Sequence, residues 1–185
     1  AVTTNDKLIN LKNKLIKNKN IIRKKKYWDY DIKNLAYNYR LSDINCALGI
    51  SQLKKTNVFV NLRKRSSLYY IKELRQLSNF LSVPKYKSYN SSSFHLFLIN
   101  LNLKNLKSNK DKLFRYLNKK DIFPQFHYKP LNMYSFYKKK EFYIGAEKYF
   151  KSSLSIPLYF GIKKSEQKYI LKNIKKFIDN NKIIN

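Results

Sequence analysis

The chain has 185 residues and a hydrophobic fraction of 43%, enough for a buried core in one domain or in part of a two-lobed protein. Three glycines and four prolines argue against a fibrous or disordered chain, and a single cysteine excludes an internal disulfide framework and is typical of a reducing cytoplasm. No apolar run approaches the roughly 20 residues that a membrane span requires, and the first residues lack the pattern of a secretory signal. We therefore expect a cytoplasmic protein with no membrane partner.

The charge is strongly positive, with 40 lysine and arginine residues against 11 acidic ones and a formal net charge of +29. Because such a charge attracts polyanions, a basic module that binds nucleic acid or another polyanion is one hypothesis. Only six of the basic residues are arginines, although the planar guanidinium is preferred for bidentate phosphate and base contacts. The chain is also rich in residues with A/T-rich codons, so genome composition explains the skew. We expect no specific nucleic-acid partner.

The N-terminal part of the chain is predicted to be mainly helical. Residues 1–4 form a short β-prone segment, which is interpreted as the end of a strand. A helix cap follows at residues 5–6. Leucine and isoleucine recur at helical spacing over residues 7–17, which predicts a first helix. Residues 24–30, which begin with three lysines, are predicted to form an exposed loop.

Two further helices are predicted before the middle of the chain. The first covers residues 42–54, is capped by its serine or aspartate, and has Cys46 on its apolar side, where we expect it in the core. The second is longer and covers about residues 57–77. Residues 78–93 are polar and contain a proline, so they are predicted to be a loop with one short strand.

The remaining half alternates apolar runs of strand length with amphipathic segments. In chain order these are a strand at 94–99, a helix opened by a capping box at Ser108, a strand at 122–127, a helix at 146–152 leading into an apolar run at 154–158, and a helix at 165–179. The last helix should bury Ile170, Ile174 and Phe177 on one face. Helices that alternate with short strands predict an α/β or α+β fold.

Few residues indicate chemistry by type and spacing alone. The sequence has no glycine-rich phosphate loop and no cysteine–histidine cluster at metal-ligand spacing, and its acidic residues are too scattered to predict a carboxylate pair. The two histidines, His95 and His127, lie in or beside predicted strands. In that position a lone histidine is interpreted first as a hydrogen-bonded structural residue.

Three polar segments are nevertheless suited to a binding site. In the first, Asn38 and Arg40 stand in a loop that opens a helix, where backbone N–H groups already favour anions. The simpler interpretation of that loop is a helix cap with an exposed cation. The second segment, Gln-Phe-His-Tyr-Lys-Pro at 125–130, and the third, Ser-Leu-Ser-Ile-Pro-Leu-Tyr at 153–159, each end in a rigid proline-containing turn.

In this order the three segments resemble the DegT-like family of sugar aminotransferases that depend on pyridoxal 5'-phosphate (PLP). Asn-Tyr-Arg at 38–40, His-Tyr-Lys-Pro-Leu at 127–131 and Ser-Leu-Ser-Ile-Pro-Leu-Tyr at 153–159 are similar to motifs of that family, at similar spacing. The resemblance covers essentially the whole chain. Residues 93–97 and 125–130 are most similar to the branch that aminates a UDP-linked 4-keto-6-deoxy-N-acetyl sugar for pseudaminic acid.

The resemblance implies the α/β fold of type I PLP-dependent transferases, which resemble aspartate aminotransferase, with this chain as the C-terminal part. Residues 1–56 would end the large PLP-binding lobe, and residues 57–185 would form a linking helix and the smaller α+β lobe. It also implies a homodimer in which the two protomers share each active site. Two departures from the family pattern are Lys19-Asn20, where His-Gly is usual, and Ala36, where glycine is usual.

The resemblance also implies roles for five residues. Asn38 would bind the phosphate of PLP held by the partner subunit, and Arg40 would help hold that phosphate or the nucleotide. Arg23 would lie near the diphosphate of the nucleotide sugar, and His127 and Tyr128 would line the sugar side of the pocket. No residue of the chain takes the catalytic position, because the Schiff-base lysine of the family would lie upstream of residue 1.

The implied reaction passes an amino group from glutamate to the C4 ketone of a nucleotide sugar, with PLP as its carrier. The chain alone is expected to be inactive, because it lacks the lysine that carries the cofactor. The basic polyanion-binding module remains the alternative hypothesis. A third is a degraded or split gene whose product only pairs with a separately encoded N-terminal half.

Overall fold

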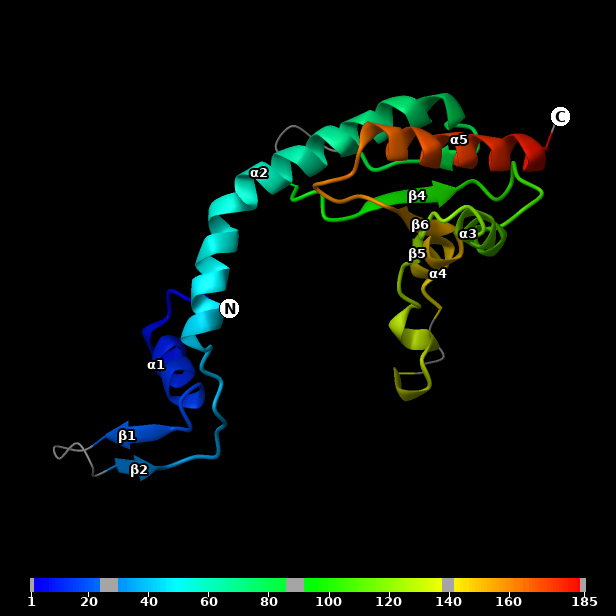
Figure 1. Ribbon diagram of the computed structural model, residues 1–185. Helices are drawn as coiled ribbons and strands as arrows, with labels where there is room; N and C mark the ends of the chain where they lie inside the picture. The colour runs from blue at the N-terminus through cyan, green and yellow to red at the C-terminus, as the bar shows by residue number, and fades with distance from the viewer. Residues whose placement is uncertain (1, 24–29, 86–91, 138–141, 184–185) are drawn as a thin grey trace. The chain divides into compact units, whose positions relative to one another are not determined.

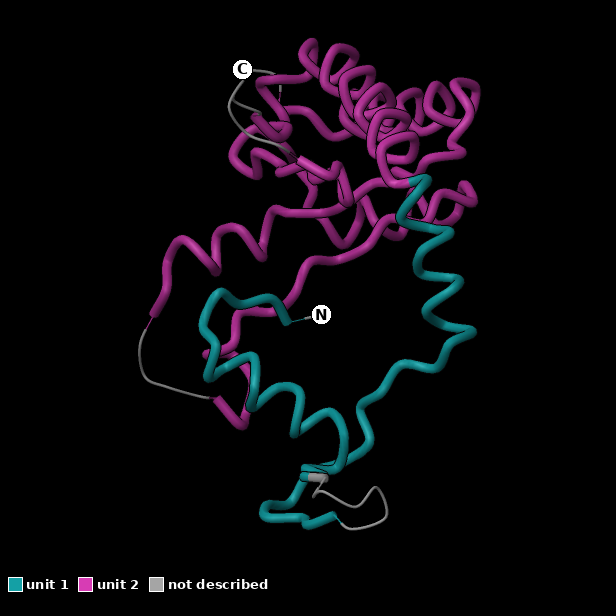
Figure 2. The backbone as a smooth tube through the Cα atoms, turned by 90° about the vertical axis from the view of Figure 1, so that its left-hand side faces the viewer, with its two compact units in different colours: residues 1–55 teal, residues 56–185 magenta. Residues whose placement is uncertain are grey.

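The computed structural model describes four stretches of the chain, residues 2–23, 30–85, 92–137 and 142–183 (Figure 1). The chain divides into two compact units, residues 1–55 and residues 56–185, which Figure 2 shows in different colours. We call them unit 1 and unit 2. The division falls within one long helix, α2, Asp43–Leu74, so this helix contributes residues to both units.

Unit 1 opens with helix α1, Lys7–Ile16, whose N-cap is the expected Asp6. One carboxylate oxygen of Asp6 accepts hydrogen bonds from the backbone N–H groups of the second and third helical residues, at 2.7 and 3.0 Å. The prediction of a strand at the start of the chain is wrong, because residues 2–4 do not form one. Instead, the hydroxyl of Thr4 accepts a hydrogen bond from the N–H of Asp6 at 3.1 Å, which turns the chain into the cap.

A short antiparallel hairpin follows α1, made of β1, Ile21–Arg23, and β2, Tyr30–Ile32. Ile21 pairs with Ile32 across the two strands. Most of the exposed loop predicted at 24–30 lies outside the described residues, and its last residue begins β2 instead.

The turn between α1 and β1 has an unusual backbone. Lys19 and Asn20 have φ angles of 56° and 53°, in the left-handed region that glycine adopts without steric cost. The amide oxygen of Asn20 is buried without a hydrogen-bond partner. Asn20 is also the one buried side chain among the described residues of unit 1, so these residues form no apolar core of their own.

Helix α2 is continuous over 32 residues and is followed by a 3-10 helix, η1, Arg75–Leu77. The expected division into two helices near residues 55–56 is therefore wrong. That stretch contains no glycine or proline, and Thr56 and Asn57 each disfavour a helix by only about 0.7 kcal/mol. The backbone hydrogen-bond ladder continues through them.

The N-terminal part of α2 is exposed along its apolar side. Cys46 is exposed, so its expected place in a core is wrong. The large apolar residues of the same stretch are between 57% and 83% exposed: Ile44, Leu48, Ile50 and Leu53. The helical spacing correctly predicts the amphipathic helix. Burial, however, needs a second surface, and no described part of unit 1 supplies one.

Unit 2 is built on a four-stranded antiparallel sheet in the order β3-β4-β6-β5. Its strands are β3, Leu81–Ser82, β4, Phe97–Leu101, β5, Gln125–Phe126, and β6, Ser153–Ile156. Ile99 and Leu154 pair at the centre of the sheet, and both are fully buried.

Two strands differ from their expected bounds. β4 begins at Phe97, three residues later than predicted, because Phe94 has a φ of 49° and is not extended. The strand expected at 122–127 is reduced to β5. Its first residue instead follows the turn that ends the preceding helix, where the N–H of Ile122 donates to the carbonyl of Leu117 at 3.1 Å.

Three α-helices and two short 3-10 helices complete unit 2. They are α3, Lys110–Asn118, η2, Leu131–Met133, η3, Ser135–Tyr137, α4, Ile144–Ser152, and α5, Lys164–Asn181. As predicted, α5 buries Ile170, Ile174 and Phe177.

The cap of α3 differs from the sequence prediction by one residue. Asn109 is the N-cap, and its side-chain oxygen accepts a hydrogen bond from the N–H of Lys112 at 3.0 Å. The hydroxyl of Ser108 is buried and has no hydrogen-bond partner in the described chain, so Ser108 does not cap the helix. Asparagine and serine are similarly good caps, so local preference alone does not choose between them.

The core of unit 2 lies between the sheet and its helices. Helix α5 and the C-terminal part of α2 lie side by side over the sheet (Figure 1), joined by a hydrogen bond of 3.0 Å from the Gln167 amide to the Ser66 carbonyl. The buried apolar cluster consists of Tyr70, Leu74, Leu77, Leu81, Phe97, Ile99, Leu101, Leu106, Leu113, Leu117, Ile122, Leu154, Ile156, Ile162, Ile170, Ile174, Phe177 and Ile178.

Candidate functional site

Four of the five residues predicted to form the site fall in two groups. Asn38 and Arg40 contact each other in unit 1, and His127 and Tyr128 lie together after β5 in unit 2. Arg23 ends β1, where the structure describes its backbone but not its side chain. Each group is thus positioned by elements of its own unit.

The loop before α2 is held by the end of α1. The N–H of Tyr39 donates to the carbonyl of Lys17 at 2.9 Å, and the N–H of Lys19 donates to the carbonyl of Tyr37 at 3.1 Å. These two bonds form an isolated antiparallel β-bridge that pairs Asn38 with Asn18. The backbone of the loop is therefore fixed even though its side chains are exposed.

Within this loop, Asn38 and Arg40 form a pair of hydrogen-bond donors. The Oδ1 atom of Asn38 accepts from both the backbone N–H and the Nε of Arg40, each at 3.3 Å. Because Oδ1 is engaged in this way, the Nδ2 group is the end of the amide that can donate to a ligand. An amide N–H and a guanidinium side by side suit an anion such as a phosphate.

The second group lies where the chain leaves β5. His127 is half-buried, and its Nε2 atom is buried without a hydrogen-bond partner in the described chain. The hydrogen bond expected of a structural histidine is therefore missing at Nε2. Burial lowers the pKa of His127 below its ordinary value of 6.5, and the nearby Lys110 ammonium lowers it further. The ring of Tyr128 stands edge-on to the imidazole at 6.4 Å and is 88% exposed.

The structure adds Lys110 to this group, a residue that the sequence reasoning missed. Lys110 is 7% exposed and begins α3. The helical spacing could have predicted this burial. Lys110 precedes Leu113 and Leu117 by three and seven residues, so it lies on the same buried face of the helix. A lysine on the apolar face of a helix is unusual, and every other lysine whose side chain the structure describes is at least partly exposed to water.

The third motif, residues 153–159, is structural in this fold. The hydroxyl of Ser153 donates to the amide oxygen of Asn100 on the neighbouring strand. The hydroxyl of Tyr70 donates to the carbonyl of Pro157 at 3.1 Å, and burial raises the pKa of Tyr70 well above its usual value. These bonds join β6 to β4 and to α2, while Pro157 and Tyr159 of the motif line a cavity of about 490 Å³ beside the start of α5.

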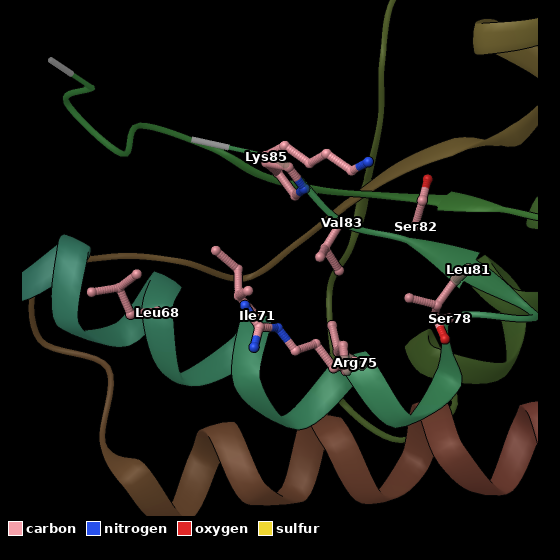
Figure 3. Close-up of a pocket in the computed structure, with 10 residues that line it drawn as sticks. Leu68, Ile71, Arg75, Ser78, Leu81, Ser82, Val83 and Lys85 are labelled. Atoms are coloured by element: carbon pink, nitrogen blue, oxygen red, sulfur yellow. The ribbon is translucent and has the colours of Figure 1, made fainter. Parts of the chain in front are cut away.

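A separate cavity of about 630 Å³ lies between the end of α2 and β3 (Figure 3). Arg75 and Lys85 bring cations to its lining and Ser78 and Ser82 bring hydroxyl groups, while the rest of the lining is apolar. None of the five predicted residues lines it. Among the described residues, no group of three histidine, cysteine or acidic side chains could hold a metal ion, and no helix is long and apolar enough to cross a membrane.

The sequence pattern of the DegT/DnrJ/EryC1/StrS aminotransferase family matches residues 1–175. The chain belongs to this family. This confirms the resemblance that the three segments at 38–40, 127–131 and 153–159 indicated.

Curated relatives include two proteins named UDP-4-amino-4,6-dideoxy-N-acetyl-beta-L-altrosamine transaminase. The one from Campylobacter jejuni is 39% identical over 173 residues, which are 92% of this chain and 45% of that protein. The one from Helicobacter pylori is 29% identical over 99% of this chain and 49% of its own length. The chain thus spans about half the length of these curated relatives.

Solved structures of aminotransferases have the same fold. Helicobacter pylori PseC, an aminotransferase involved in the biosynthesis of pseudoaminic acid, superposes with a TM-score of 0.87 at 26% identity, covering 96% of this chain and 48% of that one. The aminotransferase TlmJ of Streptoalloteichus hindustanus gives 0.85 at 18% identity, covering 95% and 46%. The predicted fold class, a partial type I PLP-dependent transferase of mixed α/β structure, is confirmed.

Proposed function

We propose that this chain is the C-terminal portion of a PLP-dependent aminotransferase that transfers an amino group from glutamate to the C4 ketone of a UDP-linked 4-keto-6-deoxy-N-acetyl sugar. The observation that carries the proposal is the 39% identity to the Campylobacter jejuni transaminase over 92% of the chain. The complete enzyme is a cytoplasmic homodimer, and its product enters the synthesis of a cell-surface sugar such as pseudaminic acid.

The donors at Asn38 and Arg40 fit the phosphate of PLP. The Nδ2 group of Asn38 and the remaining guanidinium N–H groups are donors on a loop that the end of α1 holds in place. Hydrogen bonds from such groups to a phosphate are charge-assisted and about twice as strong as neutral ones. When bound, PLP supplies the carrier on which the amino group passes between the two substrates. In the proposed dimer, this loop binds the cofactor held by the partner subunit.

The two units correspond, in this proposal, to parts of two lobes. Residues 1–56 end the large PLP-binding lobe, and residues 57–185 form the linking helix and the small lobe. The absence of an apolar core among the described residues of unit 1 supports its assignment to a larger lobe. The apolar side of α2 at Ile44 and Leu48 then packs against the remainder of that lobe.

The residues after β5 face the sugar in this proposal. Because the pKa of His127 is lowered, its imidazole is uncharged at neutral pH and exchanges hydrogen bonds with uncharged groups of the sugar. The exposed phenol of Tyr128 can do the same. Arg23, in β1, provides a cation for the diphosphate of the nucleotide.

The proposal is tested by joining the N-terminal portion of the Campylobacter jejuni transaminase to residues 1–185 in place of its own C-terminal portion. With glutamate and the UDP-linked 4-keto sugar, the chimera should produce the amino sugar. Asn38→Ala in the chimera should weaken PLP retention by about 1.5–3 kcal/mol, the usual contribution of a hydrogen bond to a charged group. PLP retention is measured by equilibrium dialysis.

The matched control is Asn34→Ala, which removes another exposed asparagine from the same segment. This variant should retain PLP like the parent chimera. A folded chimera that retains PLP but does not aminate the sugar would contradict the proposed substrate. Equal PLP retention by the Asn34→Ala and Asn38→Ala variants would contradict the role of Asn38.

A further inference from the structure

Lys110 is the one lysine with a buried side chain among the described residues of a chain with a net charge of +29. Its burial is costly, because an ammonium group loses its hydration when it leaves water. Desolvation lowers the pKa of Lys110 below its ordinary value, although the carboxylate of neighbouring Asp111 opposes this shift. A cation that is retained at such a position needs specific partners.

The structure provides partners from two other elements. The Nζ atom donates a hydrogen bond to the carbonyl of Phe150 in the last turn of α4. That end of a helix carries the partial negative charge of its dipole, so it favours a cation. The same atom lies 3.9 Å from the ring centroid of Phe150 and 4.9 Å from that of Phe126, both within cation–π range.

These contacts reach the last residue of β5. The ring of Phe126 lies within cation–π range of the Lys110 ammonium and is also stacked on the ring of Phe114, whose centroid is 4.4 Å away at an interplanar angle of 21°. β5 is only two residues long, so its backbone hydrogen bonds constrain its direction weakly. His127 follows Phe126 directly, and its orientation therefore depends on how the Phe126 side chain is held.

We propose that Lys110 is a positioning residue: by holding Phe126 against α3 and α4, it sets the direction in which His127 and Tyr128 leave β5. The proposal rests on the proposed function in one respect, the assignment of His127 and Tyr128 to the sugar side of the pocket. It deepens that assignment, because the ammonium also disfavours a second positive charge on the imidazole. Lys110 is the one charged group of the described chain that shifts His127. The uncharged histidine therefore suits a hydrogen bond with a hydroxyl or ketone of the sugar better than an interaction with a phosphate.

The first experiment compares Lys110→Met with Lys110→Arg in the 185-residue chain. Methionine keeps an unbranched apolar side chain but removes the donor and the charge, whereas arginine keeps both. The pKa of His127, measured by NMR titration of its ring, should rise in Lys110→Met and remain lowered in Lys110→Arg. Cross-peaks between the rings of Phe114 and Phe126 should weaken in Lys110→Met alone.

The matched control is Lys112→Met, which makes the same change at an exposed position of the same helix. It should leave both the pKa of His127 and the ring cross-peaks unchanged. A folded Lys110→Met chain with an unchanged pKa of His127 and unchanged cross-peaks would overturn the proposal. Far-UV circular dichroism establishes whether each variant is folded.

A second measurement needs no folded variant at position 110. In the unsubstituted chain labelled with 15N-lysine, the ammonium protons of Lys110 should exchange with water about tenfold more slowly than those of Lys112, the factor that one net hydrogen bond of typical strength provides. Equal exchange rates would overturn the proposal even if Lys110→Met does not fold. Neither measurement involves PLP or a nucleotide sugar. An inactive chimera would therefore count against the proposed function and leave the positioning by Lys110 intact.

Discussion

Unit 1 and unit 2 have similar sequence patterns but differ in what those patterns bury. Helix α1 and the N-terminal part of α2 are amphipathic, yet most of their large apolar side chains stay exposed, as at Leu8 and Leu48. In unit 2 the same kind of spacing on α5 buries Ile174 completely against a sheet. Amphipathic spacing therefore predicts a helix and its apolar side, but stability comes from the surface that covers that side.

The largest expected effect is a difference between the two units in the unfolding free energy that a large-to-small substitution costs. Phe97 is fully buried and packs against Tyr70, with the two rings tilted and their centroids 5.1 Å apart, so Phe97→Ala should cost about 3–5 kcal/mol of unfolding free energy. The corresponding change in unit 1, Leu48→Ala, should cost at most about 0.5 kcal/mol, because Leu48 is 57% exposed. Urea unfolding followed by circular dichroism measures both. A loss of several kcal/mol for Leu48→Ala would mean that unit 1 buries this residue in solution.

A smaller effect is expected at the turn of unit 1. Asn20→Gly should stabilise the β1–β2 hairpin by about 1 kcal/mol, because glycine adopts the left-handed backbone freely. The substitution also removes an amide oxygen that is buried without a partner. Amide hydrogen exchange at Ile21 and Ile32 reports the change.

The matched control for that turn is Asn13→Gly, which places glycine inside α1. This change should destabilise α1 by about 0.3 kcal/mol, since glycine is the poorer helix former. If Asn20→Gly increases the exchange rates in the hairpin instead, the left-handed turn is not present in solution.

The smallest expected effect is a pH dependence of unit 2. The pKa of His127 is lower in the folded chain than the 6.5 of the unfolded chain, mainly through burial, so the unfolded state binds more protons just below pH 6.5. Unfolding free energy should therefore fall as the pH drops through 6.5 toward the folded pKa. His127→Gln should flatten this dependence between about pH 7.5 and 5, as measured by urea unfolding. An equally steep dependence in the variant would mean that another group is responsible.

Local sequence signals accounted for many elements because their physical causes are local. Asp6 caps α1 through a carboxylate that reaches its own backbone, and the spacing of Ile170 and Ile174 gives α5 its buried face. The motifs at 38–40 and 127–131 indicated the family from residue identity and order, which require no tertiary structure. The fusion of two predicted helices into α2 was missed, since weak helix formers such as Thr56 disfavour a helix too little to end it.

The sequence by itself determined the family and the helical periodicities, and it predicted the residues that bind an anion or a sugar. Tertiary structure alone decided which apolar faces are buried, because burial depends on contacts between residues far apart in the chain. Lys110 illustrates the difference: its partners Phe126 and Phe150 come from other elements of unit 2, and nothing adjacent to it in the sequence indicates them. Likewise, the missing hydrogen-bond partner of His127 Nε2 follows from packing around the end of β5.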